Sequence, residues 1–285
     1  MTIDILLAVV VTSVIQSIFG VGVLLFGTPI LLLLGYEFVY ALTILLPISI
    51  AINTLQIARH HVHIDRAFYQ NILIYSVPPI VLFLFLVTSI KINMGFVVGL
   101  FLLFVALKSY SARIEHYLES MVRYERTYLV VMGVIHGLTN LGGSLLTAIV
   151  HGKGYSKDVT RVTVASAYAT FAIFQILTLV FAAEGLETDI KANLIYLIVG
   201  AVIYLCTEKM LYVKIDNEKY GKIFAVFLLG SGLLLIGKSF GALVDFLLGV
   251  LLGVGFYLFQ ENRDRIEEMI RRAILLVKGR RGKSF

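Results

Sequence analysis

Long apolar stretches follow one another along almost the whole chain. A helix needs roughly 20 apolar residues to cross the hydrocarbon core of a bilayer, which is about 30 Å thick. The apolar segments cover residues 3–34, 38–58, 68–89, 92–107, 127–150, 159–183, 191–206, 220–237 and 241–259. This pattern predicts an all-α polytopic membrane protein, with one transmembrane domain over residues 1–260.

The first apolar segment is too long for one plain crossing. Its roughly 32 residues would form a helix of about 48 Å, and glycines interrupt it at residues 19–22, Phe-Gly-Val-Gly. A break there yields a helical hairpin that enters the bilayer and returns. A fainter copy of the same stretch, IHGLTNLGGSLLTA at residues 135–148, predicts a second hairpin within the fifth segment.

The charged residues favour this hairpin topology over nine full crossings. Hydrophobic residues make up 59% of the chain and charged residues only 15%. If both hairpins are re-entrant and the C-terminus is inside, 21 of the 24 Lys and Arg residues lie on the inside; nine crossings give only 16. Cytoplasmic loops are enriched in Lys and Arg. We therefore expect a multi-pass protein of the cell membrane, with its N-terminus outside and its C-terminus cytoplasmic.

The topology divides the chain into two halves, residues 3–108 and 127–237. Each contains one hairpin and three crossings, and an odd number of crossings inverts the second copy relative to the first. At an offset of 119 residues, Gly35-Tyr36 falls on Gly154-Tyr155 and Gln56 falls on Gln175. We expect two inverted repeats whose hairpins meet near the centre, with residues 241–259 as an added helix.

Residues 261–285 form a basic tail. Apolar residues recur there at helical spacing between charged ones, and eight of the 24 Lys and Arg residues lie beyond residue 260. This pattern is typical of an amphipathic helix on an anionic membrane surface, and a dimer contact is the alternative. Membrane anchoring also explains the net charge of +6 without a nucleic-acid partner.

The two breaks are the candidate substrate site. Unwound glycine-rich helix ends at equivalent points of two halves are typical of transporter sites, and amides at a helix N-terminus attract anions. The candidate residues are Gln16, Gly20, Gly22, Gly27 and Thr28 in the first hairpin, and His136, Thr139, Asn140, Gly142, Gly143 and Ser144 in the second. The alternative is that the glycines only allow close helix packing.

A polar stripe follows each hairpin. Ser49, Asn53 and Gln56 share one helix face, as do Thr163, Ser166 and Thr170. Asn53, Gln56, Ser166, Thr170 and Gln175 are added to the candidate substrate-binding residues. Such side chains also form ordinary hydrogen bonds between membrane helices, which is the alternative.

Few residues offer other chemistry. His136 is the candidate for proton coupling, because histidine changes charge near neutral pH; the alternative is an inert histidine bonded to a nearby carbonyl. The histidines of RHHVHID, residues 59–65, are interpreted as interfacial residues rather than metal ligands. No catalytic constellation lies in the apolar segments, so we expect neither an enzyme nor a cofactor.

The glycine-rich segments GVGVLLFGTPILLLLGY, residues 20–36, and NLGGSLLTAIVHGKGYSKD, residues 140–158, resemble the sulfite exporter TauE/SafE family, also called the toluene-sulfonate uptake permeases. The first copy departs from the family's run of consecutive glycines at Val21. The resemblance implies a secondary carrier that moves sulfite, an organosulfonate or a similar small anion. A channel, a carrier of another solute and a structural scaffold are the alternatives; the direction of transport and the oligomeric state stay open.

Overall fold

The computed structural model describes residues 2–60, 64–90, 92–110, 123–182, 189–211 and 217–240. These residues form α1 (Ile3–Phe19), α2 (Val23–Leu34), α3 (Phe38–His60), α4 (Arg66–Ser89), α5 (Met94–Tyr110), α7 (Glu125–Thr139), α8 (Gly143–Gly152), α9 (Lys157–Ala182), α10 (Ile190–Leu211) and α11 (Asn217–Phe240). The expected helix at 241–259, the tail at 261–285, His61 and His63 lie outside the described residues. The prediction of an all-α membrane protein is confirmed.

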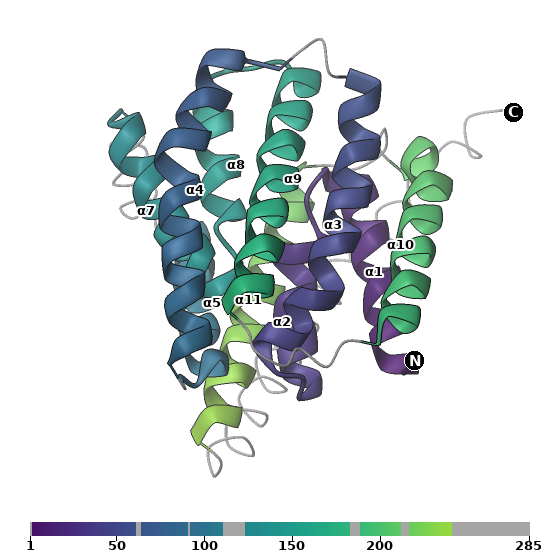
Figure 1. The fold of residues 1–285 in the computed structure, drawn as a ribbon. Coiled ribbons are helices and arrows are strands. Elements are labelled where there is room, and N and C mark those ends of the chain that lie inside the picture. The colour runs from purple at the N-terminus through teal and green to yellow at the C-terminus, as the bar shows by residue number, and fades with distance from the viewer. Residues whose placement is uncertain are drawn as a thin grey trace, which may run out of the picture. The chain divides into compact units, whose positions relative to one another are not determined.

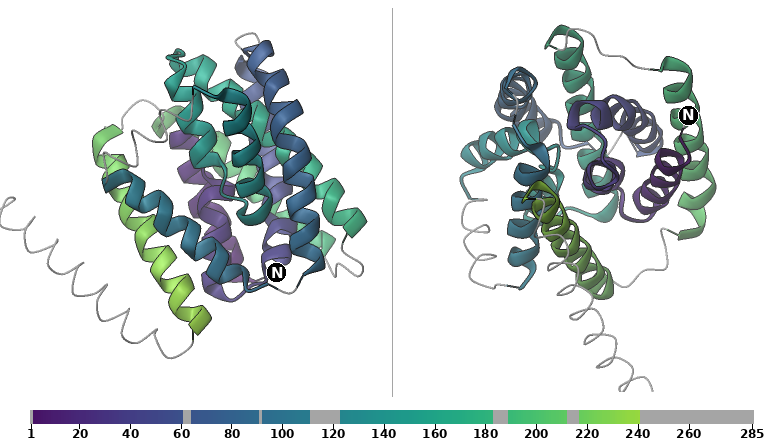
Figure 2. Two further views of the ribbon diagram at one scale, coloured as in Figure 1. Left: turned by 90° about the vertical axis from the view of Figure 1, so that its left-hand side faces the viewer. Right: turned by 90° about the horizontal axis from the view of Figure 1, so that it is seen from below.

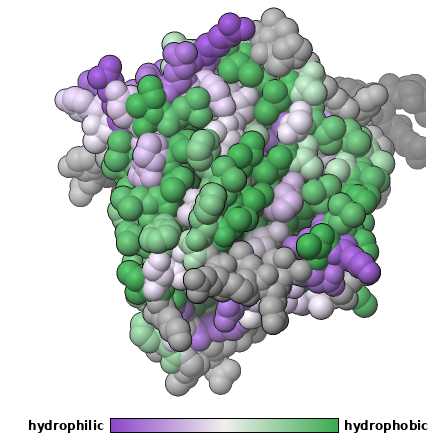
Figure 3. Space-filling model, viewed as in Figure 1, coloured by the Kyte–Doolittle hydropathy of each residue, from purple (hydrophilic) through white to green (hydrophobic). Residues whose placement is uncertain are grey.

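Four of the described helices, α3, α4, α9 and α10, are long and apolar enough to cross a membrane. Their outward faces carry exposed apolar side chains, such as Ile74 and Leu82 on α4 and Ile198 and Val202 on α10. Figure 3 shows hydrophobic residues over the middle of one face and hydrophilic ones gathered along its upper edge and at its lower right. This distribution suits a protein surrounded by lipid, because apolar side chains then meet apolar solvent.

Both predicted breaks are present. α1 ends at Phe19, Gly20 adopts a left-handed conformation with φ of 76°, and α2 begins at Val23. α7 ends at Thr139, Asn140 is left-handed with φ of 61°, and α8 begins at Gly143. In each case the N–H of the left-handed residue donates to a carbonyl four residues earlier, at 2.8 Å. Glycine and asparagine are the residues that adopt this helix-ending conformation most readily.

Helix contacts correspond between the halves when α1, α3 and α4 of the first half are matched in order with α7, α9 and α10 of the second. α1 packs on α10 and α4 on α7, and in the same way α3 packs on α10 and α4 on α9 (Figures 1 and 2). α3 also packs on α9. The hydroxyl of Tyr155, just before α9, donates to Asp65, just after α3, so these two helices run antiparallel.

The second arm of each hairpin ends in the same way. Gly35 and Gly154 are both left-handed, with φ of 98° and 66°, and a tyrosine follows each. Tyr36 donates to Asp4 Oδ2 at 2.7 Å, and the Tyr155 hydroxyl donates to Asp65. Asp65 also accepts from Phe68 N at 3.0 Å as the N-cap of α4, and these two bonds hold the pKa of its carboxyl below the ordinary range.

α5 and α11 touch backbone to backbone. A Cβ on Gly99 would lie 2.9 Å from Gly232 O, and a Cβ on Gly232 would lie 2.9 Å from Gly99 O. Leu103 and Ile236 flank this contact, each within 3.0 Å of one of those Cβ positions. Only glycine at both positions allows the two helices to approach so closely.

Candidate functional site

The first break, which we call tip one (residues 20–22), is held by the side chain of Gln16. Gln16 Oε1 accepts from Val23 N at 2.8 Å, and Gln16 Nε2 donates to Asn53 Oδ1 at 3.1 Å. Asn53 Nδ2 donates in turn to Ser49 Oγ at 3.0 Å. These side chains are buried, and Gln16 covers the first amide of α2. The predicted glutamine and asparagine therefore meet at tip one, where they stabilise the turn and link it to α3.

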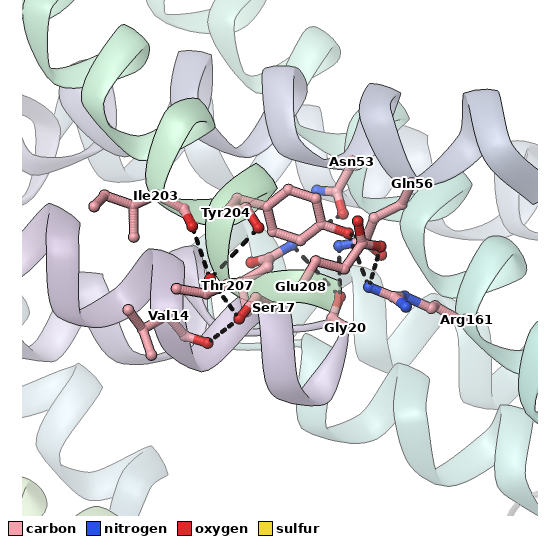
Figure 4. A network of polar contacts seen from close by, with 11 residues as sticks. Val14, Ser17, Gly20, Asn53, Gln56, Arg161, Ile203, Tyr204, Thr207 and Glu208 are labelled. Atoms are coloured by element: carbon pink, nitrogen blue, oxygen red, sulfur yellow. Dashed lines mark hydrogen bonds and ion pairs between the residues drawn. The ribbon is translucent and has the colours of Figure 1, made fainter. Parts of the chain in front are cut away.

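Two long side chains lie over Gly20 (Figure 4). Gln56 Nε2 approaches Gly20 O at 3.5 Å, a weak hydrogen bond, and Gln56 Oε1 has no hydrogen-bond partner among the described residues. A Cβ on Gly20 would lie 3.4 Å from Arg161 Cγ, 3.9 Å from Arg161 Nε and 3.9 Å from Gln56 Oε1. Tip one thus places a glycine backbone beside an amide and a guanidinium.

Arg161 belongs to a buried charged group that connects α9 with α10. Its Nη2 lies 2.9 Å from Glu208 Oε1 and donates to Tyr204 OH at 2.8 Å, while Tyr204 donates to Glu208 at 2.6 Å. The side chains of Arg161 and Glu208 are each 6% exposed. Arg161 is one of the 21 Lys and Arg residues that the predicted topology places inside, and the sequence analysis does not single it out as a site residue. The available signal was its position inside an apolar segment, since ionisable residues there usually pair and serve function.

The second break, tip two (residues 140–142), is neutral. Asn140 Nδ2 donates to Thr28 Oγ1 at 2.9 Å, and Gln175 Nε2 donates to Asn140 Oδ1 at 3.2 Å. All three side chains are buried. The two hairpins therefore touch, and Gln56 and Gln175 occupy matching places, because each reaches the left-handed residue of one break.

Tip two lies beside an arm of the first hairpin, and the two tips are apart from each other. Tip two contacts α2 at Thr28, five residues or about 7.5 Å beyond the start of α2 at Val23. The α9 residues that reach the tips, Arg161 at tip one and Gln175 at tip two, are 14 positions or about 21 Å apart along the helix. The site therefore consists of two polar clusters, one at each tip.

Four of the candidate glycines provide close packing. A Cβ on Gly22 would lie 2.7 Å from Gln16 N, and one on Gly142 would lie 2.6 Å from His136 Cβ, so both face the first arm of their own hairpin. A Cβ on Gly27 would lie 2.7 Å from Leu45. At Gly143 the position of a Cβ is taken by Tyr168, whose hydroxyl oxygen would be 1.1 Å away. The packing interpretation accounts for these four residues.

His136 lies behind tip two and is fully buried. Its ring is 5.1 Å from the Phe171 ring and 6.0 Å from the Tyr168 ring, the latter in an edge-on arrangement. These contacts come from α9, the helix that also carries Gln175. The histidine is thus next to the cluster at tip two, enclosed by aromatic rings.

The remaining candidates form local bonds. Thr139 donates to Ile135 O at 2.7 Å and accepts from Leu141 N at 3.2 Å, and Ser144 donates to Leu141 O at 3.4 Å, so both brace the turn at tip two. Ser166 donates within α9. Thr170 shares a hydrogen bond of 2.5 Å with Tyr69 on α4. The structure brings neither Ser166 nor Thr170 into the hydrogen bonds at either tip.

A groove of about 770 Å³ lies elsewhere, at the C-terminal end of α2. Tyr36, Glu37, Asn93 and Lys238 are among its lining residues, and Lys238 Nζ donates to Leu32 O and Leu33 O. None of the candidate residues lines it. Among the described residues no group of three or more His, Cys, Asp or Glu side chains could hold a metal ion.

The hairpins, their breaks and the polar tips lie within residues that match a family model. The model described as sulfite exporter TauE/SafE matches residues 5–235. The chain belongs to this family. No curated protein and no solved structure matches the chain. Membership in the TauE/SafE family confirms the resemblance and makes the chain a membrane transport protein, in a family of transporters of sulfite and related sulfur anions.

Proposed function

We propose that the protein is a secondary transporter that moves a small sulfur-containing anion, such as sulfite or an organosulfonate, by alternating access. One observation carries the proposal. Two apolar hairpins break at equivalent points, at Gly20 and Asn140, and a glutamine from the equivalent position of the next helix reaches each break. Such paired breaks are where transporters bind substrate.

The alternating motion rests on a second part of the proposal, that residues 3–108 and 127–237 are inverted repeats. The exchange of helix contacts between the halves supports it, as do the antiparallel course of α3 and α9 and the matching Gly-Tyr ends of both hairpins. In inverted-repeat transporters one half rocks against the other around the binding site. The excess of Lys and Arg in the inside loops orients the N-terminus outside and the C-terminus in the cytoplasm.

The tips offer the donors that an oxyanion requires. At tip two the Asn140 amide and the Thr28 hydroxyl already bond to each other, and at tip one the Gln56 amide makes only a weak bond. Groups that bond to each other without substrate can exchange those bonds for bonds to substrate oxygens. They then keep a hydrogen-bond partner both with and without substrate, which burial requires. A proton accompanies the anion in this proposal, with His136 as its acceptor beside tip two.

Flux measurements in proteoliposomes test the function. We expect saturable uptake of sulfite or a small organosulfonate, with little uptake of nitrate or phosphate, and a dependence on an imposed pH gradient that His136→Gln removes. Saturable flux of no sulfur anion would overturn the proposal. Conductance that never saturates, unaffected by replacing Asn140, would indicate a channel instead.

A further inference from the structure

The buried ion pair beside tip one calls for an explanation. Arg161 and Glu208 lie in apolar helices, and each side chain is only 6% exposed. The free energy needed to take two charges out of water often exceeds the free energy gained from their attraction. A buried ion pair is therefore weak evidence for a stabilising role. Ionisable side chains at membrane depth usually mark the path of a substrate or ion.

The position of Arg161 links this pair to the proposed substrate site. Its side chain crosses the face of Gly20, with Nε 3.9 Å from the position of a Cβ there, while Nη2 contacts Glu208 and Tyr204. Gln56, whose Oε1 lacks a partner among the described residues, borders the same point. The stem of Arg161 therefore lies against the broken backbone, and its guanidinium reaches a carboxylate.

The chemistry of the carboxylate resembles that of the proposed cargo. A guanidinium presents a planar set of donors that fits the oxygens of a carboxylate, and the oxygens of sulfite or a sulfonate offer the same negative, hydrogen-bond-accepting edge. Glu208 Oε1 occupies at Nη2 the place that such an oxygen would take. The carboxylate is thus an internal analogue of an anionic ligand.

We propose that Arg161 is the counter-charge for the transported anion, and that Glu208 is its internal competitor, which holds the guanidinium in the empty transporter. Binding of the anion displaces the carboxylate from Nη2. Glu208 lies three residues before the end of α10 at Leu211, so the displaced carboxylate is close to the end of the helix. The inference rests on the proposed function, because it names how that site recognises its substrate.

The matching position of the opposite half carries no charge. At the offset of 119 residues that aligns Gln56 with Gln175, Arg161 aligns with Leu42, which is fully buried. An ion pair needed only to join a hairpin to its neighbours would have a use in both halves. Among the described residues such a pair stands at one tip and not at the other, which assigns charge recognition to tip one.

The test compares the directions in which replacing Arg161 and replacing Glu208 change anion binding. Removing either partner of a structural ion pair harms the protein in the same direction, whereas removing a competitor strengthens ligand binding. In the purified full-length protein we expect Glu208→Gln to lower the KM for sulfite or methanesulfonate flux about tenfold. We expect Arg161→Gln to raise the KM at least tenfold. The KM of Arg161→Lys should lie between those of Arg161→Gln and the wild type, because lysine keeps the charge but lacks the planar pair of donors.

A matched control and a second readout keep the test decisive. Thr207→Val, on the same helix as Glu208, removes a partly buried hydrogen bond of 2.8 Å to Ser17 on α1, and it should leave KM unchanged. The rise in thermal midpoint that sulfite or methanesulfonate produces, measured against chloride, reports binding without transport. If Arg161→Gln fails to fold, Glu208→Gln alone decides, since unchanged or weaker binding contradicts the proposal.

The outcomes separate this inference from the proposed function. Saturable flux with both variants shifted in the same direction overturns the role of Arg161 and leaves the transport function standing. Opposite shifts in anion binding without wild-type flux support the role of Arg161 and overturn transport. Absence of both flux and anion-dependent stabilisation overturns both.

Discussion

The two hairpin tips share one backbone design and differ in charge. At each tip a left-handed residue ends the first arm, a glycine packs against that arm, and a glutamine from the following helix reaches the break. Tip two uses Asn140, whose amide bonds to Thr28; tip one uses Gly20, whose missing side chain leaves room for the stem of Arg161. The turn is thus the same in both hairpins, while the residue at its left-handed position decides which side chains can approach it.

The largest effect is expected from Gly143→Leu at tip two. The hydroxyl of Tyr168 occupies the position of a Cβ on Gly143, so a leucine must displace Tyr168 and the start of α8. Flux in proteoliposomes should fall to background while the protein still inserts. Val180→Leu, at an exposed position on α9, is the control and should transport normally. Normal flux in Gly143→Leu would show that tip two is not part of the site.

The two glutamines should differ in their effects on stability and on transport. Gln175→Ala removes the 3.2 Å bond to Asn140 Oδ1 and leaves a buried acceptor unpaired, which costs about 1–3 kcal/mol. Gln56→Ala removes a bond of 3.5 Å and should cost less than about 0.5 kcal/mol. Thermal unfolding in detergent measures both. We expect the first variant to lose more stability, and the second to raise the KM of transport more; the reverse order would make tip two the binding tip.

Asp65 gives a pH-dependent effect of intermediate size. Its pKa is lowered in the folded protein by the bonds from Phe68 N and Tyr155 OH, so the stability it contributes is complete above its unfolded pKa of about 3.9 and is lost as pH falls through the lower, folded value. Asp65→Ala should cost about 1 kcal/mol at pH 7 as a lost N-cap, and the difference from the wild type should shrink in acid. A difference that stays constant down to pH 3 would contradict this assignment.

The smallest effects belong to the tyrosines that close the second arms. Tyr36→Phe and Tyr155→Phe each remove one hydrogen bond to a carboxylate, and each should lower the stability of the folded protein only slightly. The two carboxylates lie in different places, because Asp4 is in the first turn of α1 and Asp65 is the N-cap of α4. Both losses should nevertheless be small, because all four side chains are half-buried. Chemical unfolding of both variants, compared with Tyr69→Phe, which loses its bond to Thr170 instead, measures these losses. A loss in either variant as large as that of Gln175→Ala would contradict this ranking.

The sequence allowed the helices and both breaks to be predicted from local information. Apolar length located every described helix or hairpin, because the bilayer sets how long such runs must be. The break at residues 19–22 stood out because glycines interrupt an apolar segment too long for one crossing, and the second hairpin, residues 135–148, stood out as a fainter copy of the first. The match of Gln56 with Gln175 needed only the repeat offset, and both side chains reach a break in the structure.

What could not be predicted depends on partners distant in the sequence. Arg161 pairs with Glu208, 47 positions away on another helix, and nothing near either residue indicates that contact. A glycine shows that something comes close without showing what it is, so Gly143 could equally have faced a ligand or, as found, Tyr168. Thr170 shared a predicted polar face and nevertheless turned out to bond to Tyr69.

The contact between Gly99 and Gly232 limits how α5 and α11 can move against each other. Because no side chain separates the two backbones, a change in the crossing angle of the helices meets little steric resistance. Sliding of α5 along α11 is resisted, because the bulky side chains of Leu103 and Ile236 would clash with the opposite helix. The two glycines therefore allow α5 and α11 to change their angle while they keep their register.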